Sequence, residues 1–269
     1  MRARIVAAPA PLIPPRGSWA WALAGAALGL VCALALFAPA RWLTVPIERA
    51  AHGRLLLGEP RGTVWTGSAE LIFTGGEGSK DAAALPTRVE WRIRPRWNGF
   101  VAQLNSPCCT EVPVRLRVLP RWSGARVAVA DGRSRWPAGI LVGLGTPWNT
   151  LQIDGELLLA TEGLSVEWVA GRLAIAGRAE LTAQRMSSRL STLRPMGSYR
   201  ITLSGGETPA LQLQTLEGSL QLTGSGRWVG SRLHFSGIAS AAPDRETALS
   251  NLLNIIGRRN GARSIITIG

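Results

Sequence analysis

The sequence predicts a mainly β protein, with a single N-terminal transmembrane helix, an antiparallel meander, curved or sandwich-like β domain, and one C-terminal amphipathic helix. Three observations predict this class. One uncharged apolar run lies near the start, apolar and polar residues alternate through most of the remainder, and one late stretch has helical spacing. A content of 31 glycines and 17 prolines, against one Tyr and four Phe, also favours turns over long helices.

The apolar run extends from Trp19 to Ala38 without a charged residue. About twenty helical residues cross a hydrocarbon core of roughly 30 Å. Because Arg2, Arg4 and Arg16 precede the run and no acidic residue does, the positive-inside rule predicts a cytoplasmic N-terminus and an exported remainder in the cell envelope. The side chains predicted to hold the anchor in the bilayer are Trp19, Trp21, Leu23, Leu30, Leu36, Phe37 and Trp42.

A cleaved signal peptide is the competing interpretation, because Ala38-Pro39-Ala40 resembles a small-residue processing site. The apolar run exceeds the usual signal-peptide core of about 7 to 15 residues, and proline makes a poor cleavage site. We therefore expect an uncleaved anchor.

Beyond the anchor, Leu43 to Leu57 has helix-compatible spacing, and the pattern changes to period two at Gly62. The predicted organisation is a cytoplasmic tail (1–18), a transmembrane helix (19–38), a helical connector (39–60) and a periplasmic β-rich domain (61–269) with a possible sub-boundary near 145–150.

Alternating segments that break at glycine or proline recur about every ten residues, which is typical of an antiparallel meander, a sandwich or an open curved sheet. Residues 150–187 and 198–242 resemble each other loosely, as runs of short strands ending in glycine-marked pairs. The predicted strands lie within residues 62–76, 89–95, 112–120, 125–132, 151–163, 164–171, 172–184, 199–206, 211–218, 219–230, 232–241 and 264–269.

The stretch from Asp244 to Gly257 predicts the amphipathic helix, with Asp244 as N-cap and Gly257 as the stopping glycine. Packing on the sheet is the favoured role, and binding to a partner or to a membrane surface is the alternative. Its predicted apolar face consists of Ala248, Leu249, Leu252, Leu253 and Ile256.

The formal charge of +13 raises the question of nucleic-acid binding. The arginines are scattered among acidic residues and accompany no nucleic-acid motif, so no nucleic-acid partner is predicted. Of the three cysteines, Cys32 lies in the apolar run, and Cys108 and Cys109 are neighbours. A reduced pair in a turn after Pro107 is the favoured interpretation, with a strained or intermolecular disulfide as the alternatives.

No pattern in the sequence predicts catalysis, a metal site or a cofactor. The histidines, His52 and His234, form no metal-binding pair, and His234 fits an exposed strand position. Asp154 and Glu156 share one face of a predicted strand, which is common on solvated surfaces. The glycine clusters fit hairpin turns and lack the residues of a phosphate-binding loop.

Five blocks, GTVWTG from Gly62, LPTRVEW from Leu85, GSGRW from Gly224, FSGIASA from Phe235 and LLNIIGRR from Leu252, resemble protein N of the bacterial type II secretion system. The closing blocks are the most specific, whereas residues 100–144 share only the alternating strand pattern with the family. The resemblance implies a non-enzymatic inner-membrane component of the machine that moves folded proteins across the outer membrane of Gram-negative bacteria. It implies no cofactor, and no functional site residue carries over.

Two functions fit these observations. A scaffold would contact other secretion components through sheet edges and, in the bilayer, through Gly25, Ala26 and Gly29. A membrane-anchored carrier of lipid or another hydrophobe, similar to AsmA-like proteins, would need an open apolar groove, for which Leu157 to Ala160 is a hint. An enzyme acting on the cell wall is disfavoured because a site is missing. The sequence leaves homo-oligomerisation open.

Overall fold

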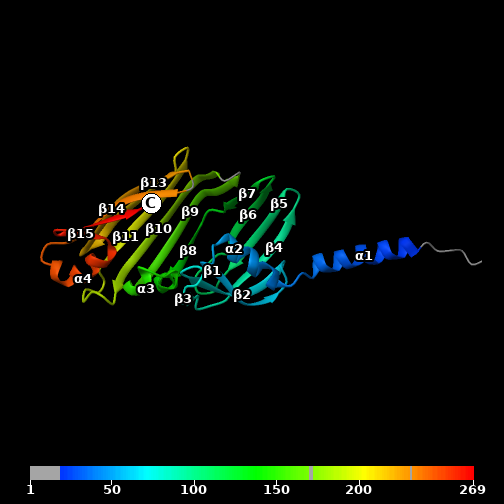
Figure 1. Cartoon of the computed structure of the whole chain (residues 1–269), viewed down its shortest axis with the longest axis horizontal. Helices are drawn as coiled ribbons and strands as arrows, with labels where there is room; N and C mark the ends of the chain where they lie inside the picture. The colour runs from blue at the N-terminus through cyan, green and yellow to red at the C-terminus, as the bar shows by residue number, and fades with distance from the viewer. Residues whose placement is uncertain (1–18, 170–171, 231) are drawn as a thin grey trace, which may run out of the picture. The chain divides into compact units, whose positions relative to one another are not determined.

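The computed structural model describes residues 19–169, 172–230 and 232–269, and the chain divides into one unit ending at Ala38 and a second from Pro39 to Gly269 (Figure 1). In the first unit, α1 (Trp19–Leu36) is a continuous helix with no buried side chain. Among the described residues it is the one helix long and apolar enough to cross a membrane. The predicted apolar helix is therefore confirmed, while the predicted tail, residues 1–18, lies outside the described residues.

The connector is only partly helical, which corrects the prediction of a helix reaching Leu57. The helical part consists of η1 (Ala40–Leu43) and α2 (Thr44–Ala50). His52 and Gly53 then take left-handed backbone angles, with φ of 52° and 70°, and the Gly53 N–H donates to the Glu48 carbonyl at 2.8 Å. Residues from Leu55 onward pair with a neighbouring strand, because apolar side chains here gain more from the sheet than from a short isolated helix.

The second unit is built on one open antiparallel sheet of 16 strands whose order nearly follows the chain. Among the meander, curved-sheet and sandwich alternatives, the structure is thus an open meander. The strands are β1 (Leu55–Gly62), β2 (Thr66–Thr74), β3 (Ala82–Ala84), β4 (Val89–Arg96), β5 (Gly99–Asn105), β6 (Val114–Arg121), β7 (Gly124–Val129), β8 (Gly132–Pro137), β9 (Ile153–Val169), β10 (Arg172–Ser188), β11 (Gly197–Gly206), β12 (Ala210–Gly218), β13 (Leu220–Val229), β14 (Arg232–Ala241), β15 (Arg258–Asn260) and β16 (Arg263–Ile268).

Strands β9 and β10 are 17 residues each and form the longest hairpin of the sheet. The two strands predicted within 151–163 and 164–171 are one strand, because β9 continues through Gly163. Gly163 and Gly177 take positive φ values of 56° and 81°, and the β9–β10 register shifts beside them, so these glycines form a bulge rather than a turn. Strands β7 and β8 lie end to end along β9.

Because side chains alternate across a strand, the register assigns each residue to one of two faces. On one side, which we call the apolar face, aligned rows run from strand to strand, such as Trp91, Leu104 and Val114 in β4, β5 and β6. The short helices cover part of this face. Ala40 and Leu43 of η1 pack with Ala69 and Trp91. The 3-10 helix η2 (Ala138–Leu144), α3 (Trp148–Leu151) and α4 (Glu246–Ile256) contribute Ala138, Leu151 and three leucines to the largest core cluster.

Helix α4 confirms the predicted amphipathic helix, with Leu249, Leu252 and Leu253 buried. Two details of its ends differ from the prediction. Arg245 occupies the N-cap position without a side-chain cap, and Asp244 precedes it with a φ of 62°. Gly257 ends the helix in an extended conformation, and a side chain there would overlap the Ile265 carbonyl. A glycine is therefore needed at position 257 because β16 approaches closely, and not because the backbone makes a left-handed turn.

Candidate functional site

The predicted anchor residues divide between two elements. Trp19, Trp21, Leu23, Leu30 and Leu36 lie on α1, and Phe37 follows it, all with exposed side chains. Trp42 lies in η1 and is 51% exposed. Beside it Val45 is also exposed, whereas Leu43 and Ile47 turn toward the sheet. The connector therefore has an outer surface bearing Trp42 and Val45 and an inner surface that contacts the apolar face.

The residues considered for catalysis remain apart. His52 lies exposed in the turn after α2, and His234 is exposed on β14, as its strand position predicts. Glu156 Oε2 lies 3.7 Å from Arg185 Nη2, while Asp154 Oδ1 accepts a hydrogen bond from the Gly155 N–H at 2.9 Å. Within the described part of the chain, no three His, Cys, Asp or Glu side chains cluster as metal ligands would. This geometry offers no basis for assigning a reaction.

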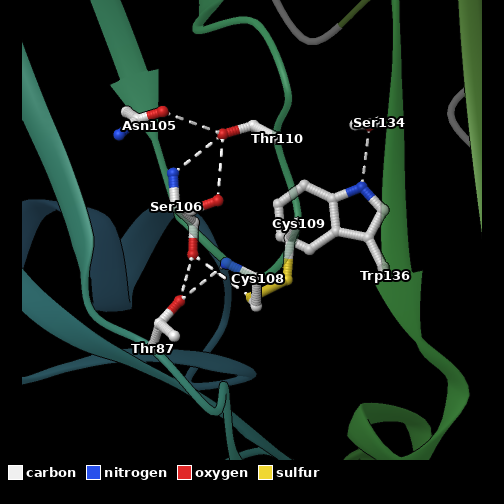
Figure 2. The surroundings of a disulfide bond; sticks show 8 residues. All are labelled: Thr87, Asn105, Ser106, Cys108, Cys109, Thr110, Ser134 and Trp136. Atoms are coloured by element: carbon white, nitrogen blue, oxygen red, sulfur yellow. Dashed lines mark hydrogen bonds between the residues drawn. A yellow bond between two sulfur atoms is a disulfide. The ribbon is translucent and has the colours of Figure 1, made fainter.

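The predicted reduced cysteine pair is wrong, because Cys108 and Cys109 form a disulfide (Figure 2). They lie in the tight loop between β5 and β6. The Cys108 N–H donates to Thr87 Oγ1 at 3.2 Å, and Thr87 Oγ1 lies 2.9 Å from Ser106 Oγ. From the other side, the Arg135 N–H of β8 donates to the Cys109 carbonyl at 2.8 Å. The loop is thereby tied to the segments before β4 and within β8.

Apolar packing holds the same loop in place. Cys109 is buried in a cluster with Leu85, Val89 and Ile140, and Trp136 packs against this cluster. Figure 2 shows the Trp136 ring beside Cys109, with its indole N–H directed to Ser134 Oγ at 2.8 Å. The disulfide loop thus packs against Ile140 of η2, and Cys109 is part of the folded core.

The face opposite the apolar face carries four arginines and one glutamate, Glu90, over β4 to β6. The register aligns Arg92 with Gln103 and Arg115, and it aligns Arg94 with Val101 and Arg117 in the next row. We call these four residues, Arg92, Arg94, Arg115 and Arg117, the arginine face. All four are exposed, and across the described ranges no carboxylate lies within the 4.0 Å ion-pair distance of any of them. Such a surface suits an acidic partner.

A cavity of about 290 Å³ lies between the connector and the apolar face. Leu43 and Ile47 close it on the connector side, and Leu57, Trp91 and Leu104 line the sheet side. Its exposed wall is entirely apolar. Its size lies near the lower end of the range of about 300–1,000 Å³ that ligand pockets occupy.

The two edges of the sheet are poor templates for an added strand. In β1 the register shifts between Gly58 and Arg61, Glu59 has a φ of 43°, and Pro60 has no N–H to donate. The other edge, β15, is three residues long and begins with two arginines. Bulges, proline, charge and short length all protect edges from pairing. The predicted contact through sheet edges therefore has less support than a contact through the arginine face.

Tyr199 of β11 is a buried polar side chain in the largest core cluster. Burial raises the pKa of its phenol, because the surrounding core disfavours the charged phenolate. Its hydroxyl has no hydrogen-bond partner among the described residues. The side chain contributes apolar packing and carries an unsatisfied polar atom.

Comparison with protein families identifies the fold. The profile described as "Type II secretion system (T2SS), protein N" matches residues 53–266, which spans the sheet from the turn before β1 into β16. The chain belongs to the type II secretion system protein N family. Membership implies a role in type II secretion and interaction with other components of that system. Neither the curated proteins nor the solved structures searched give a match to this chain.

Sequence reasoning missed two features of this T2SS protein N. The arginine face carries a visible signal, since arginines recur at every second residue in both β4 and β6. Alternation alone does not show that only β5 separates these two strands in the sheet. The sequence therefore suggests that the arginines are scattered rather than gathered on one surface. The disulfide had no positive signal, because adjacent cysteines bond only where the backbone turns tightly.

Proposed function

We propose that this chain is a non-enzymatic, single-pass inner-membrane component of the type II secretion system that supports export of folded proteins across the outer membrane. The family match over residues 53–266 carries the proposal. Helix α1, with arginines before it, supports an anchor with a cytoplasmic start and a periplasmic sheet. The Cys108–Cys109 disulfide fits the oxidising periplasm, where such bonds persist.

The arginine face is the surface we assign to another secretion component. Four exposed arginines without acidic partners within the described chain attract a carboxylate-rich surface and speed its encounter. The opposite face is apolar and partly covered by helices, so it has less charge to offer. The contact is therefore with an acidic surface of a partner in the same machine.

The test replaces Arg94 and Arg117 with a photocrosslinking residue, one at a time, in cells that secrete a folded substrate. We expect crosslinks to another secretion component from these positions and none from His234, an exposed residue on a distant strand. The double variant R94E/R117E should abolish secretion, and R94K/R117K should retain most of it. Secretion at the normal level with R94E/R117E, together with crosslinks to no secretion component, would contradict the proposed contact.

A second candidate function is supported by the apolar cavity beneath the connector. A membrane-anchored protein with a cavity of this kind could hold one apolar chain, as a lipid or hydrophobe carrier does. The exposed arginines of β4 and β6 argue against a groove that is apolar on both faces of the sheet. Extraction of the purified full chain, followed by mass spectrometry, should recover a stoichiometric lipid if this function holds. An extract that is unchanged by Leu104→Trp, which fills the cavity, would exclude it.

A further inference from the structure

Tryptophan follows arginine at three turns of the chain with nearly the same sequence. The segments are Arg96-Trp97-Asn98-Gly99, Arg121-Trp122-Ser123-Gly124 and Arg227-Trp228-Val229-Gly230. Each stands where one strand ends and the next begins, in the β4–β5, β6–β7 and β13–β14 hairpins. A fourth tryptophan, Trp168, stands at the end of β9.

The turns of all four hairpins lie at the same end of the strands. In an antiparallel meander, successive turns alternate between the two ends of the strands. The β4–β5, β6–β7, β9–β10 and β13–β14 turns share one end, because the strand order follows the chain with β7 and β8 lying end to end. The disulfide loop, η2, α3 and α4 lie at the other end, and Figure 1 shows α3 and α4 along the lower side of the sheet, away from the upper hairpin tips.

Three of these four tryptophans have exposed side chains, as Trp42 of the connector does. Trp97 and Trp122 are fully exposed, Trp168 is 47% exposed, and Trp228 is half-buried beside the exposed Val229. At the opposite end, Trp148 packs against the largest core cluster. Large aromatic side chains on a free surface are informative because most tryptophans are buried in folded proteins. We call Trp97, Trp122, Trp168 and Trp228 the tryptophan rim.

The charge at the rim is predominantly positive. Arg96, Arg121, Arg172, Arg227 and Arg232 lie at the strand ends of these hairpins. Glu167 pairs with Arg121 at 3.8 Å and is the one acidic residue in these four hairpin ends, and Glu207 lies in the β11–β12 turn at the same end of the strands. Tryptophan and arginine together match the interface of a bilayer, where indole rings lie at headgroup level and basic side chains meet anionic lipids.

The rim is at the end of the sheet where the second unit begins. Pro39 forms a bridge with Thr63 in the β1–β2 turn, and Trp65 of that turn accepts a hydrogen bond from the Ile93 N–H of β4. The Trp65 ring also lies 6.4 Å from the ring of Phe100, next to the β4–β5 turn. Two residues separate Pro39 from the end of α1, a path of roughly 10 Å at most in extended chain. The chain therefore enters the second unit at this end of the strands, two residues after α1 ends.

We propose that the tryptophan rim lies in the interface of the bilayer that holds α1, with the indole rings among the lipid headgroups and the rim arginines on anionic phospholipid phosphates. This inference rests on the proposed membrane anchoring. The sheet then stands on the membrane by its rim, and the end that carries the disulfide loop and α4 points toward the periplasm.

The test uses the full chain in vesicles of phosphatidylethanolamine and phosphatidylglycerol, on a Cys32→Ser background. An environment-sensitive fluorophore is attached at Ser123→Cys on the rim or, as the matched control, at Asn251→Cys on the exposed side of α4. We expect a blue-shifted emission and severalfold weaker iodide quenching at position 123 than at position 251. The variant W97S/R96S should remove most of the difference in quenching between the two positions. Vesicles without phosphatidylglycerol should show a smaller difference than vesicles that contain it.

Flotation of the chain with the vesicles reports the anchor separately. Equal quenching at both positions in chains that float would overturn the rim contact and leave the anchor intact. Chains that fail to float would overturn both. A rim that stays accessible in lipid vesicles but is protected in cells would also overturn the proposal, since a protein would then cover it.

Discussion

The substitution Leu253→Ala tests whether α4 packs on the sheet. Leu253 is 0% exposed and lies in the core cluster with Leu249, Leu252 and Leu220. The change removes three buried carbons at about 0.8 kcal/mol each and leaves a cavity, so we expect a loss of about 3 kcal/mol. Because alanine is the best helix former, the loss cannot come from helix propensity. In a domain of this size it lowers Tm by roughly 6–12 °C.

The assay is thermal unfolding of the full chain in detergent, followed by the circular dichroism of the sheet. Ile255→Ala is the matched control, since Ile255 lies on the same helix and is 38% exposed. We expect it to change the free energy of unfolding by less than about 1 kcal/mol. Equal Tm shifts for the two variants, or no shift for Leu253→Ala, would refute packing on the sheet and support a partner- or membrane-binding helix.

Three further substitutions test local features of the fold. Gly124→Ala should lower the free energy of unfolding by about 2 kcal/mol or more, because a side chain there would overlap the Trp168 carbonyl. Gly139→Ala, whose added carbon meets no atom within 4 Å, should be nearly neutral in urea unfolding, and similar midpoints for the two variants would contradict the register of β7 on β9. Thr87→Val should lower the free energy of unfolding by about 1–2 kcal/mol, because its hydrogen bonds to the disulfide loop are lost. Thr44→Val, whose exposed hydroxyl donates to the Arg41 carbonyl, should lower it by less than about 0.5 kcal/mol, and the reverse order would show that the loop is held by other contacts. Tyr199→Phe should leave stability at neutral pH unchanged or raise it by up to about 1 kcal/mol, since an unpaired buried hydroxyl is removed. The raised pKa of Tyr199 means that the folded state keeps the phenol protonated, whereas the unfolded state ionises it above about pH 10, so the free energy of unfolding falls as the pH rises above that value. Tyr199→Phe should therefore resist alkaline unfolding better than the natural chain, and identical pH profiles would contradict this.

The elements of the fold follow from local patterns. The uncharged run containing Trp19 and Leu36 predicts α1, and Leu249, Leu252 and Leu253 predict the buried face of α4. Alternation predicts most strands of the meander. These predictions succeed because hydrophobic length and periodicity are properties of neighbouring residues. The ends of elements were less predictable, as Leu55 to Leu57 show, because a strand forms there only when a partner strand is available.

The sequence by itself determined that this chain has one apolar helix, many short strands and one amphipathic helix, and its blocks near both ends of the sheet indicated the family. Only the tertiary structure decided which strands are neighbours. That arrangement places Arg92 and Arg94 on the same face as Arg115 and Arg117 with only β5 between them, bonds Cys108 to Cys109 in a tight loop, and brings Trp97, Trp122 and Trp168 to one end of the strands. Strand pairing joins residues far apart in sequence, and the free energy that selects it comes from contacts that no single segment contains.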